Sequence, residues 1–284
     1  MTATLMDGTA LAARIRTELR GDVGELGEIG LATVLVGEDT ASKIYIRLKH
    51  RAAEEVGIRA VDRRLPEETS EDELLQLVGE LNDDDSIDGI LVQTPLPSHI
   101  DEARVMRTID PMKDVDGLHP FNAGQLFFGR QTFVGATPVG IMRLLGEYGI
   151  PIEGARAVVV GRSLIVGRPV AMLLLHANAT VTICHSRTDD LARQTLDADI
   201  LVVAVGTPAV ITADMVKLGG AVVDVGINRT EGGLVGDVDP AVAEVAACLT
   251  PVPGGVGPMT IACLLENAIR AARYRRGALA FPRI

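Results

Sequence analysis

The chain has 284 residues, 47% of them hydrophobic, which is enough for two domains of ordinary size, each with its own core. Aromatic residues make up only 3%, so the cores must consist of Val, Ile, Leu and Ala, the mixture typical of parallel sheets covered by helices on both faces. The formal net charge of −11 disfavours a nucleic-acid or anionic-membrane partner. The arginines near the end of the chain are interpreted as the basic end of a helix; they are Arg270, Arg273, Arg275 and Arg276.

The cysteines and the N-terminal segment indicate the compartment. The three cysteines are odd in number and lack metal-ligand spacing, so we predict neither a disulfide framework nor a metal site. Leu11, Ile15 and Leu19 share one face of an opening helix, which lacks the continuous apolar stretch of a signal peptide. No run approaches the length of a membrane span. We therefore expect a cytoplasmic protein.

After the opening helix, hydrophobic periodicity divides the first half of the chain into alternating strands and helices, which implies a parallel sheet. Ser70 and Glu73 form a capping box at the start of one helix. The predicted elements are a buried strand at 29–37, a helix at 42–56, a strand at 58–65, a helix at 71–81 and a buried strand at 87–93. Residues 94–135 are rich in Pro, Gly and Asp and are predicted to be loops around one short helix. Loops that follow strand ends commonly carry function.

A helix predicted at 137–150, with Pro138 in its first turn, is interpreted as the bridge to a second domain. A second series follows, with a strand, turn and helix over 155–175, a strand and exit turn over 179–188, and strands over 198–208 and 219–228. A Pro/Gly loop at 250–260 leads into a terminal helix at 262–276. The predicted fold class is α/β, with domains over residues 1–138 and 139–260.

The first strand–turn–helix of the second series predicts a nucleotide site. Gly161, Arg162 and Ser163 follow a buried strand, and Val166 and Gly167 lead into a helix, so that a pyrophosphate can meet backbone N–H groups at the helix N-terminus. The spacing departs from G-x-G-x-x-G because Ser163 replaces a second glycine. Taken alone, the motif therefore leaves a plain β–α turn as an alternative.

The end of the next strand bears on the choice of nucleotide, because an acidic residue there selects NAD through the ribose hydroxyls. This strand ends in His185, Ser186 and Arg187 without a carboxylate, so a 2′-phosphate is tolerated and NADP is favoured over NAD. The alternative is that these are solvated loop residues. Two further strands end at the same rim. The candidate cofactor-binding residues are Gly161, Arg162, Ser163, Val166, Gly167, His185, Ser186, Arg187, Gly206, Thr207, Pro208, Gly226, Ile227 and Asn228.

Candidate catalytic residues lie in the first half. Tyr45 and Lys49 are four residues apart on the helix at 42–56 and share one face. A lone lysine at the edge of an apolar face more often extends into water, which is the alternative for Lys49. Gln93 ends a buried strand in the same half, and Asp114 and Asp116 follow in a loop bounded by glycine.

Seven segments resemble, in order and spacing, the signature segments of the methylenetetrahydrofolate dehydrogenase/cyclohydrolases. They are VGEDTASKIYIRLKHRAAEEVGI, GILVQTPLP, KDVDGLHPFNAG, VVVGRSLIVGRP, ATVTICHSRT, VDVGIN and TPVPGGVGPMT, spread from Val36 to Thr260. The resemblance implies an N-terminal α/β folate-binding domain, a C-terminal Rossmann-type NADP-binding domain, and a terminal helix (261–284) that packs back on the first domain. It also implies a homodimer that oxidises 5,10-methylenetetrahydrofolate with NADP and hydrolyses the 5,10-methenyl product to 10-formyltetrahydrofolate, in one-carbon metabolism.

The resemblance also implies roles for individual residues. Tyr45 would stack on the aminobenzoyl ring of the folate, Lys49 would be the catalytic lysine assisted by Gln93, and Asp116 would hold the pterin. Arg162 and Ser186 occupy positions that contact the 2′-phosphate in NADP-using members. The residues that would close over the folate from the other domain are Gly255, Val256, Gly257 and Pro258.

The chemistry sets two requirements. Hydride transfer needs two large ligands held in contact across an interdomain cleft. Attack of water on the methenyl carbon needs a proton acceptor, and Lys49 can serve only if burial and a cationic substrate lower its pKa from about 10.4.

Two departures from the family pattern, Ala136 for Cys and Thr94 for Leu, affect local packing and ligand affinity rather than the type of reaction. The alternatives are a dehydrogenase with little cyclohydrolase activity, a nucleotide-sensing module, and a generic NAD(P)-dependent amino-acid dehydrogenase. The sensing module would have no reason to hold Tyr45, Lys49, Gln93 and Asp116 together, and the amino-acid dehydrogenase would need a different first domain.

Overall fold

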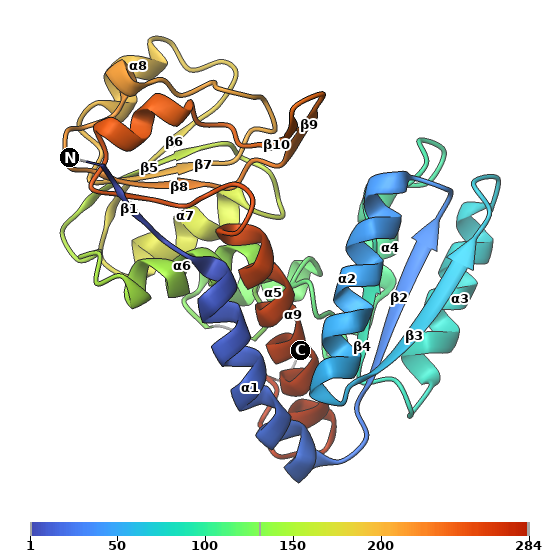
Figure 1. Ribbon diagram of the computed structural model, residues 1–284. Helices are drawn as coiled ribbons and strands as arrows, with labels where there is room; N and C mark the ends of the chain where they lie inside the picture. Colours follow the sequence, from blue (N-terminus) through green and yellow to red (C-terminus); the bar gives the residue numbers. More distant parts are fainter. Residues whose placement is uncertain (1, 131, 283–284) are drawn as a thin grey trace. The chain divides into compact units, whose positions relative to one another are not determined.

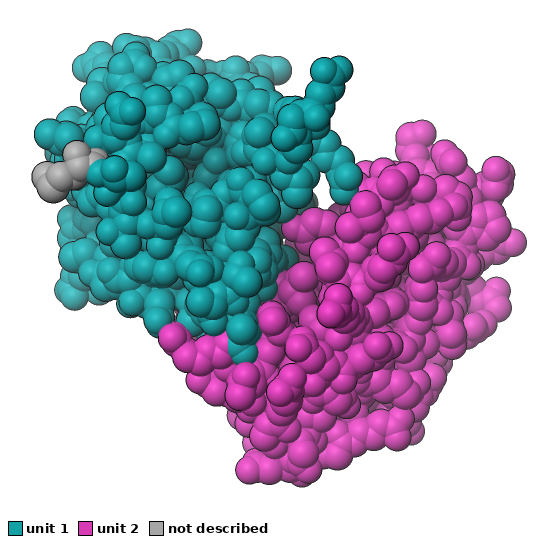
Figure 2. Space-filling model, viewed as in Figure 1, with its two compact units in different colours: residues 1–13, 137–260 teal, residues 14–136, 261–284 magenta. Residues whose placement is uncertain are grey.

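The computed structural model describes residues 2–130 and 132–282 (Figure 1). The chain divides into two compact units, unit 1 with residues 1–13 and 137–260, and unit 2 with residues 14–136 and 261–284 (Figure 2). The chain passes from one unit to the other within α1 (Gly8–Leu26), at the start of α6 (Ala136–Glu147) and within α9 (Val256–Arg275).

Unit 2 contains a three-stranded parallel sheet in the order β3-β2-β4, with β2 at Gly30–Val36, β3 at Arg59–Leu65 and β4 at Gly89–Val92. Every residue of β2 is buried, so both faces of the strand must be covered. Ala32 and Val34 face a core formed with α3 (Glu71–Asp83) and α4 (Glu102–Thr108). Thr33 faces the opposite way, where its Oγ1 lies 2.6 Å from Nε2 of His50 on α2 (Thr40–Val56). Figure 1 shows α2 and α3 on opposite sides of this sheet.

Local signals in the sequence account for the helix ends of unit 2. The Asp39 carboxylate accepts the Ser42 N–H at 2.7 Å and caps the start of α2, and Gly57 ends this helix with a φ of 91°. The predicted capping box of Ser70 and Glu73 is confirmed at the start of α3. Over residues 94–130 and 132–135, the structure has two helices, α4 and α5 (Pro120–Phe127), where one was predicted.

The C-terminal part of α9 belongs to unit 2. Asn267 is buried, and its Nδ2 donates to the carbonyls of Val115 (2.8 Å) and Val134 (2.9 Å). Arg275 Nη1 donates to Asp88 Oδ1 at 3.1 Å, and Arg276 Nη2 donates to the Glu28 carbonyl at 2.6 Å. These arginines therefore anchor the helix end to carbonyl and carboxylate oxygens of unit 2.

Unit 1 contains a six-stranded sheet in the order β1-β11-β8-β7-β5-β6, in which all pairings are parallel. The strands are β1 (Thr4–Leu5), β5 (Arg156–Val160), β6 (Thr180–Cys184), β7 (Ile200–Val203), β8 (Ala221–Asp224) and β11 (Cys248–Leu249). Figure 1 shows α6 and α7 (Gly167–His176) on one side of this sheet and α8 (Leu191–Thr195) on the other. The short helices η1 (Ala213–Met215) and η2 (Pro240–Glu244) contribute to the core on the α8 side.

The structure corrects two expectations about unit 1 and adds an element that was not predicted. Residues 1–13 were placed in the first domain, but Thr4 pairs with Cys248 and Leu5 with Leu249, so this segment completes the sheet of unit 1. The terminal helix was predicted from residue 262, but α9 begins at Val256. The antiparallel hairpin of β9 (Asn228–Thr230) and β10 (Gly233–Val235) was not predicted.

Candidate active site

A buried lysine is the centre of the candidate site in unit 2. The Lys49 side chain extends from α2 and the residue is only 8% exposed. Its Nζ donates to Gln93 Oε1 at 3.0 Å and lies 5.9 Å from the centroid of the Tyr45 ring. The Gln93 Nε2 donates to the Thr94 carbonyl at 2.8 Å, which directs the amide oxygen toward the lysine. Lys49 is therefore not a solvated helix residue.

Burial sets the electrostatics of this site. Desolvation lowers the pKa of Lys49, and the charge of Asp116 opposes that shift. Desolvation raises the pKa of Asp116 to about 6, against the opposing effect of the Lys49 charge. Burial also raises the pKa of Tyr45. The Lys49 amine thus loses its proton more readily than an ordinary lysine. The Asp116 carboxyl group, close to it, gains a proton more readily than an ordinary aspartate.

The loop that carries Asp116 is fixed by its neighbours. Lys113 is 1% exposed, and its Nζ donates to the carbonyls of Leu81 (2.9 Å), Asn82 (2.6 Å) and Asp84 (2.8 Å) at the end of α3. The Asp114 carboxylate accepts the His119 N–H and the Asn122 Nδ2–H, both at 2.8 Å. Sequence reasoning assigned no role to Lys113 or Asn122. Together these bonds leave Asp116 on a rigid loop.

The turn after β5 in unit 1 is built for close backbone approach. A Cβ added to Gly161, whose φ is +127°, would lie 2.3 Å from the Ala204 carbonyl oxygen, so only glycine fits there. The Ser163 hydroxyl accepts the N–H groups of Val166 (3.2 Å) and Gly167 (3.3 Å) at the start of α7. Ser163 thus holds the turn against the start of α7, which accounts for a serine where the usual dinucleotide motif has glycine.

The end of β6 presents polar groups at the surface. Ser186 and Arg187 are exposed, and so is Arg162 on the turn after β5. The Arg187 N–H donates to His185 Nδ1 at 3.2 Å and shapes the turn. The nearest following carboxylates belong to Asp189 and Asp190, and that of Asp190 caps α8 by accepting the Arg193 N–H at 3.2 Å.

The candidate residues after β7 and β8 lie on two loops that share a buried anchor. Gly206 has a φ of +67°, and residues 206–208 are exposed. Ile227, in the loop 226–228, is 45% exposed. Both loops are bonded to Asp237, a buried residue to which sequence reasoning gave no role.

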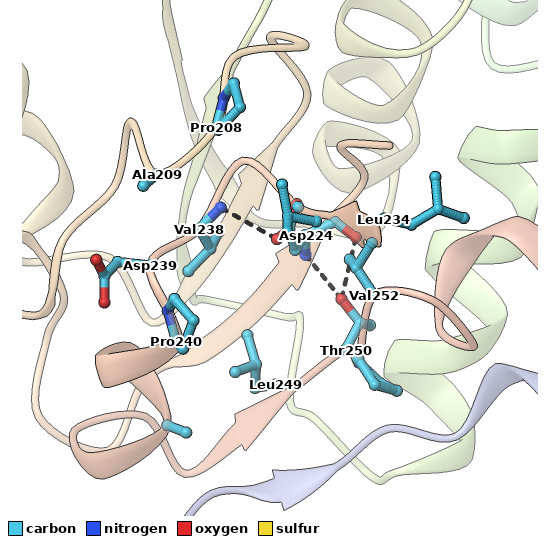
Figure 3. Close-up of a pocket in the computed structure, with 14 residues that line it drawn as sticks. Pro208, Ala209, Asp224, Leu234, Val238, Asp239, Pro240, Leu249, Thr250 and Val252 are labelled. Atoms are coloured by element: carbon cyan, nitrogen blue, oxygen red, sulfur yellow. Dashed lines mark hydrogen bonds between the residues drawn. The ribbon is translucent and has the colours of Figure 1, made fainter. Parts of the chain in front are cut away.

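Unit 1 also contains a pocket of about 450 Å³, shown in Figure 3. It is lined by Pro208, Ala209, Asp224, Leu234, Val235, Gly236, Val238, Asp239, Pro240, Ala243, Leu249, Thr250, Pro251 and Val252. Of the sequence-predicted cofactor residues, Pro208 alone is in this lining, so the pocket does not coincide with the candidate nucleotide turn.

The predicted substrate-closing residues lie in unit 1. Gly255 donates its N–H to the Pro251 carbonyl at 2.8 Å, and Val256, Gly257 and Pro258 form the first turn of α9. The structure describes these residues within unit 1 and the Lys49 cluster within unit 2.

Two absences hold for the described residues. Over 2–130 and 132–282, no cluster of three or more His, Cys, Asp or Glu residues is placed to hold a metal ion. In the same ranges, none of the helices combines the length and apolar character needed to cross a bilayer.

The fold and the site together define a class. One unit is a parallel α/β sheet with a glycine turn feeding a helix at the strand ends, where nucleotides bind in open α/β sheets. The other unit holds a buried lysine with a lowered pKa beside a glutamine, an aspartate and a tyrosine. This is the arrangement of a nucleotide-dependent enzyme with acid–base chemistry in a separate unit.

Comparison with known proteins identifies the family. The family model of the tetrahydrofolate dehydrogenase/cyclohydrolase catalytic domain matches residues 6–116. The family model of the NAD(P)-binding domain of the same enzymes matches residues 135–276. The bifunctional protein FolD of Moorella thermoacetica is 56% identical over 279 residues, which is 96% of this chain and all of the relative.

Solved structures agree. The crystal structure of FolD from Campylobacter jejuni, a bifunctional methylenetetrahydrofolate dehydrogenase/cyclohydrolase, has a TM-score of 0.94 at 49% identity. The match covers 96% of this chain and 99% of the other. The Trypanosoma brucei N5,N10-methylenetetrahydrofolate dehydrogenase-cyclohydrolase, solved with NADP and an inhibitor, has a TM-score of 0.93 at 40% identity. The match covers 99% of this chain and 100% of the other. The chain belongs to the tetrahydrofolate dehydrogenase/cyclohydrolase family, which confirms the resemblance found in the sequence and the two-domain α/β fold.

Proposed function

We propose that this chain oxidises 5,10-methylenetetrahydrofolate with NADP and hydrolyses the 5,10-methenyl product to 10-formyltetrahydrofolate. The observation that carries the proposal is the buried Lys49 amine, bonded to the neutral Gln93 amide, in the unit that matches the family's catalytic domain. A solvated lysine would keep its proton near neutral pH, whereas desolvation lowers the pKa of this one. A lowered pKa suits an amine that accepts a proton from the attacking water.

The roles of the folate-binding residues follow from their chemistry. Tyr45 offers an aromatic face on the same helix as Lys49, suited to stacking on the aminobenzoyl ring. Asp116 offers carboxylate oxygens to the N–H groups of the pterin. Gly255, Val256, Gly257 and Pro258 supply a backbone without bulky polar groups, which suits closure over the folate.

The hydrolytic step moves protons between water, Lys49 and N5 of the folate. Oxidation moves a hydride from the methylene carbon to the nucleotide and leaves a methenyl cation. The water oxygen then bonds to the methenyl carbon while Lys49 takes one of its protons, and Gln93 holds both the amine and the water without adding charge. The bond from this carbon to N5 then breaks: N5 receives the proton from the Lys49 ammonium, the hydroxyl left by the water releases its remaining proton to solvent as it becomes the formyl C=O, and the product is the neutral 10-formyl compound.

The proposed nucleotide site is the rim of the unit 1 sheet. Gly161 lets the turn after β5 pack closely against Ala204 at the end of β7, and the exposed Arg162, Ser186 and Arg187 are suited to a 2′-phosphate. The carboxylate of Asp190 is occupied as a helix cap, which reduces competition for the ribose hydroxyls. NADP is therefore the cofactor we assign to this rim.

We extend the proposal to a homodimer in the cytoplasm. The strand β6 lies at the end of the sheet order, and Ile183 on β6 and Leu175 on α7 are 43% and 51% exposed. An open strand edge beside exposed apolar side chains suits pairing with a second copy. Light scattering on the purified chain should give twice the mass of about 30.0 kDa; a monomer at micromolar concentration would contradict the dimer.

A single assay tests the two activities together. NADPH and the methenyl chromophore are followed after methylenetetrahydrofolate and NADP are mixed with the enzyme. We expect NADPH to form while the methenyl compound stays low, because it is hydrolysed as it appears. Accumulation of methenyl compound equal to the NADPH formed, with hydrolysis no faster than in buffer, would favour the dehydrogenase with little cyclohydrolase activity. NADP reduction by an amino acid would contradict the folate substrate.

A further inference from the structure

Asp237 links the two candidate cofactor loops through one buried carboxylate. It lies just after β10 and has no exposed surface. Its Oδ2 accepts the N–H groups of Val205 (2.7 Å) and Gly206 (2.9 Å) at the end of β7. Its Oδ1 accepts the Asn228 Nδ2–H at 2.8 Å, at the start of β9 and four residues after the end of β8. The three donors are neutral amides on segments that are distant in the sequence.

A second carboxylate fixes Asp237 itself. Asp224 ends β8, and its Oδ1 accepts the N–H groups of Asp237 (2.9 Å) and Gly226 (3.0 Å). Its Oδ2 accepts the Val238 N–H at 3.1 Å, and Thr250 Oγ1 accepts the Asp224 N–H at 2.7 Å (Figure 3). The position of Asp237 is therefore determined from both its main chain and its side chain.

Two glycines leave room for these carboxylates. A Cβ added to Gly226 would lie 2.2 Å from Asp237 Oδ1, and one added to Gly236 would lie 1.7 Å from Asp224 Oδ2. The main chain thus passes against both carboxylates at distances that no other residue type allows. Gly226 was predicted to belong to the cofactor site, and the structure gives it a separate reason to be glycine.

The bonding pattern explains why a carboxylate is used at this position. Burial of a charged group costs free energy unless hydrogen bonds replace its hydration. A carboxylate has two oxygens that only accept, so it can bond donors on two loops at once. A hydroxyl or an amide would offer fewer acceptors in the same volume.

We propose that Asp237 is a positioning residue for NADP, which holds residues 205–208 after β7 and residues 226–228 after β8 at a fixed separation. The proposal rests on the proposed nucleotide site. These loops end two adjacent strands, since Val203 pairs with Asp224, and ligands of open α/β sheets bind at such strand ends. Loss of the carboxylate frees both loops without altering unit 2, where Lys49 and its partners lie.

The experiment compares D237A and D237N with D239A as the control. Asp239 is two residues away and its Oδ1 accepts the Ala241 N–H at 2.8 Å to cap η2, without a bond to either loop. For each variant, NADP affinity is measured by titration, KM and kcat by NADP reduction, and cyclohydrolase activity by decay of the methenyl compound without nucleotide. Thermal unfolding is recorded in parallel.

We expect D237A to raise the Kd and KM for NADP about tenfold or more, in line with the loss of hydrogen bonds to a charged group, and to keep the parental cyclohydrolase rate. D237N should recover most of the affinity, because its amide oxygen still accepts from Val205 and Gly206. D239A should bind NADP like the parent. If D237A is insoluble, D237S is measured in the same way.

The outcomes that overturn the proposal are distinct. Parental NADP affinity and KM in D237A would show that the loops do not need this carboxylate. A parallel fall of both activities with a lower unfolding temperature would show a purely structural role. A D237N variant that binds NADP as weakly as D237A would contradict the assignment of loop positioning to the bonds from Val205 and Gly206. If the parent protein itself does not bind NADP, the proposed function fails rather than this inference.

Discussion

Replacement of Lys49 by methionine should separate the two reactions, because one needs a proton acceptor and the other does not. Water attack on the methenyl carbon uses the Lys49 amine as the base, and general base catalysis is typically worth about 10² to 10⁴-fold. We expect the cyclohydrolase rate of K49M to fall by that factor. Dehydrogenase activity should fall less, to the extent that the amine also orients the substrate. NADP affinity should not change, because the nucleotide residues are in unit 1.

The structure indicates that K49M folds. Methionine keeps most of the side-chain volume, and what is lost is the 3.0 Å bond to Gln93, whose Nε2 keeps its bond to the Thr94 carbonyl. Exchange of a buried cation for an apolar side chain of similar size removes a desolvation cost as well as a hydrogen bond. The free energy of unfolding should therefore change by no more than about 1–2 kcal/mol.

The control is K43M, which removes a partly exposed lysine of the same helix that is ion-paired with Glu38. Exposed ion pairs contribute about 0–1 kcal/mol, so this variant should keep both activities and nearly all of its stability. The assay is decay of the methenyl chromophore, with urea unfolding of each variant. A folded K49M protein that hydrolyses the methenyl compound at the parental rate would refute the role of Lys49 as the base.

Further predictions concern Arg162, Asp116 and Lys113. R162A should lower NADP affinity about 10 to 100-fold and leave NAD affinity unchanged, as measured by titration; equal use of NAD and NADP by the parent would contradict the assignment. D116A should weaken folate binding but not NADP binding by calorimetry. Since the pKa of Asp116 is raised to about 6 and the ionised form accepts from the pterin, the parental KM for folate should rise as pH falls below about 6, a dependence that D116N should lack. K113M should lower the free energy of unfolding by about 2–4 kcal/mol in urea, because three carbonyls at the end of α3 lose their donor; a change below that of K43M would contradict this.

The elements with strong local signals could be predicted from the sequence. The capping box at Ser70, the periodicity of α2 and the buried strands β2 and β5 all lie within a few residues of their predicted bounds. These features depend on neighbouring residues, which a single sequence contains.

The features that could not be predicted depend on contacts between distant residues. The strand β1 has only two residues and exists because it pairs with β11, more than two hundred positions away. Asp237 shows the same limitation in the site, since its donors at Val205, Gly206 and Asn228 are brought together only by the sheet. A short strand or a lone aspartate carries no local pattern that reveals such a partner.

The two buried lysines of unit 2 show why burial alone does not mark a catalytic group. Lys113 is less exposed than Lys49, and its three N–H groups are matched by three carbonyls that lie at a helix C-terminus, where a cation is stabilised. Within the described residues, the hydrogen bonding of the Lys49 amine is limited to Gln93, so its other N–H positions are not bonded to a protein acceptor. Loss of a proton from Lys113 would break a structural bond, whereas loss of a proton from Lys49 leaves the bond to Gln93 possible through a second N–H. A buried ionisable group can therefore act as a base where its hydrogen bonds are unsaturated, and this criterion favours Lys49 over Lys113.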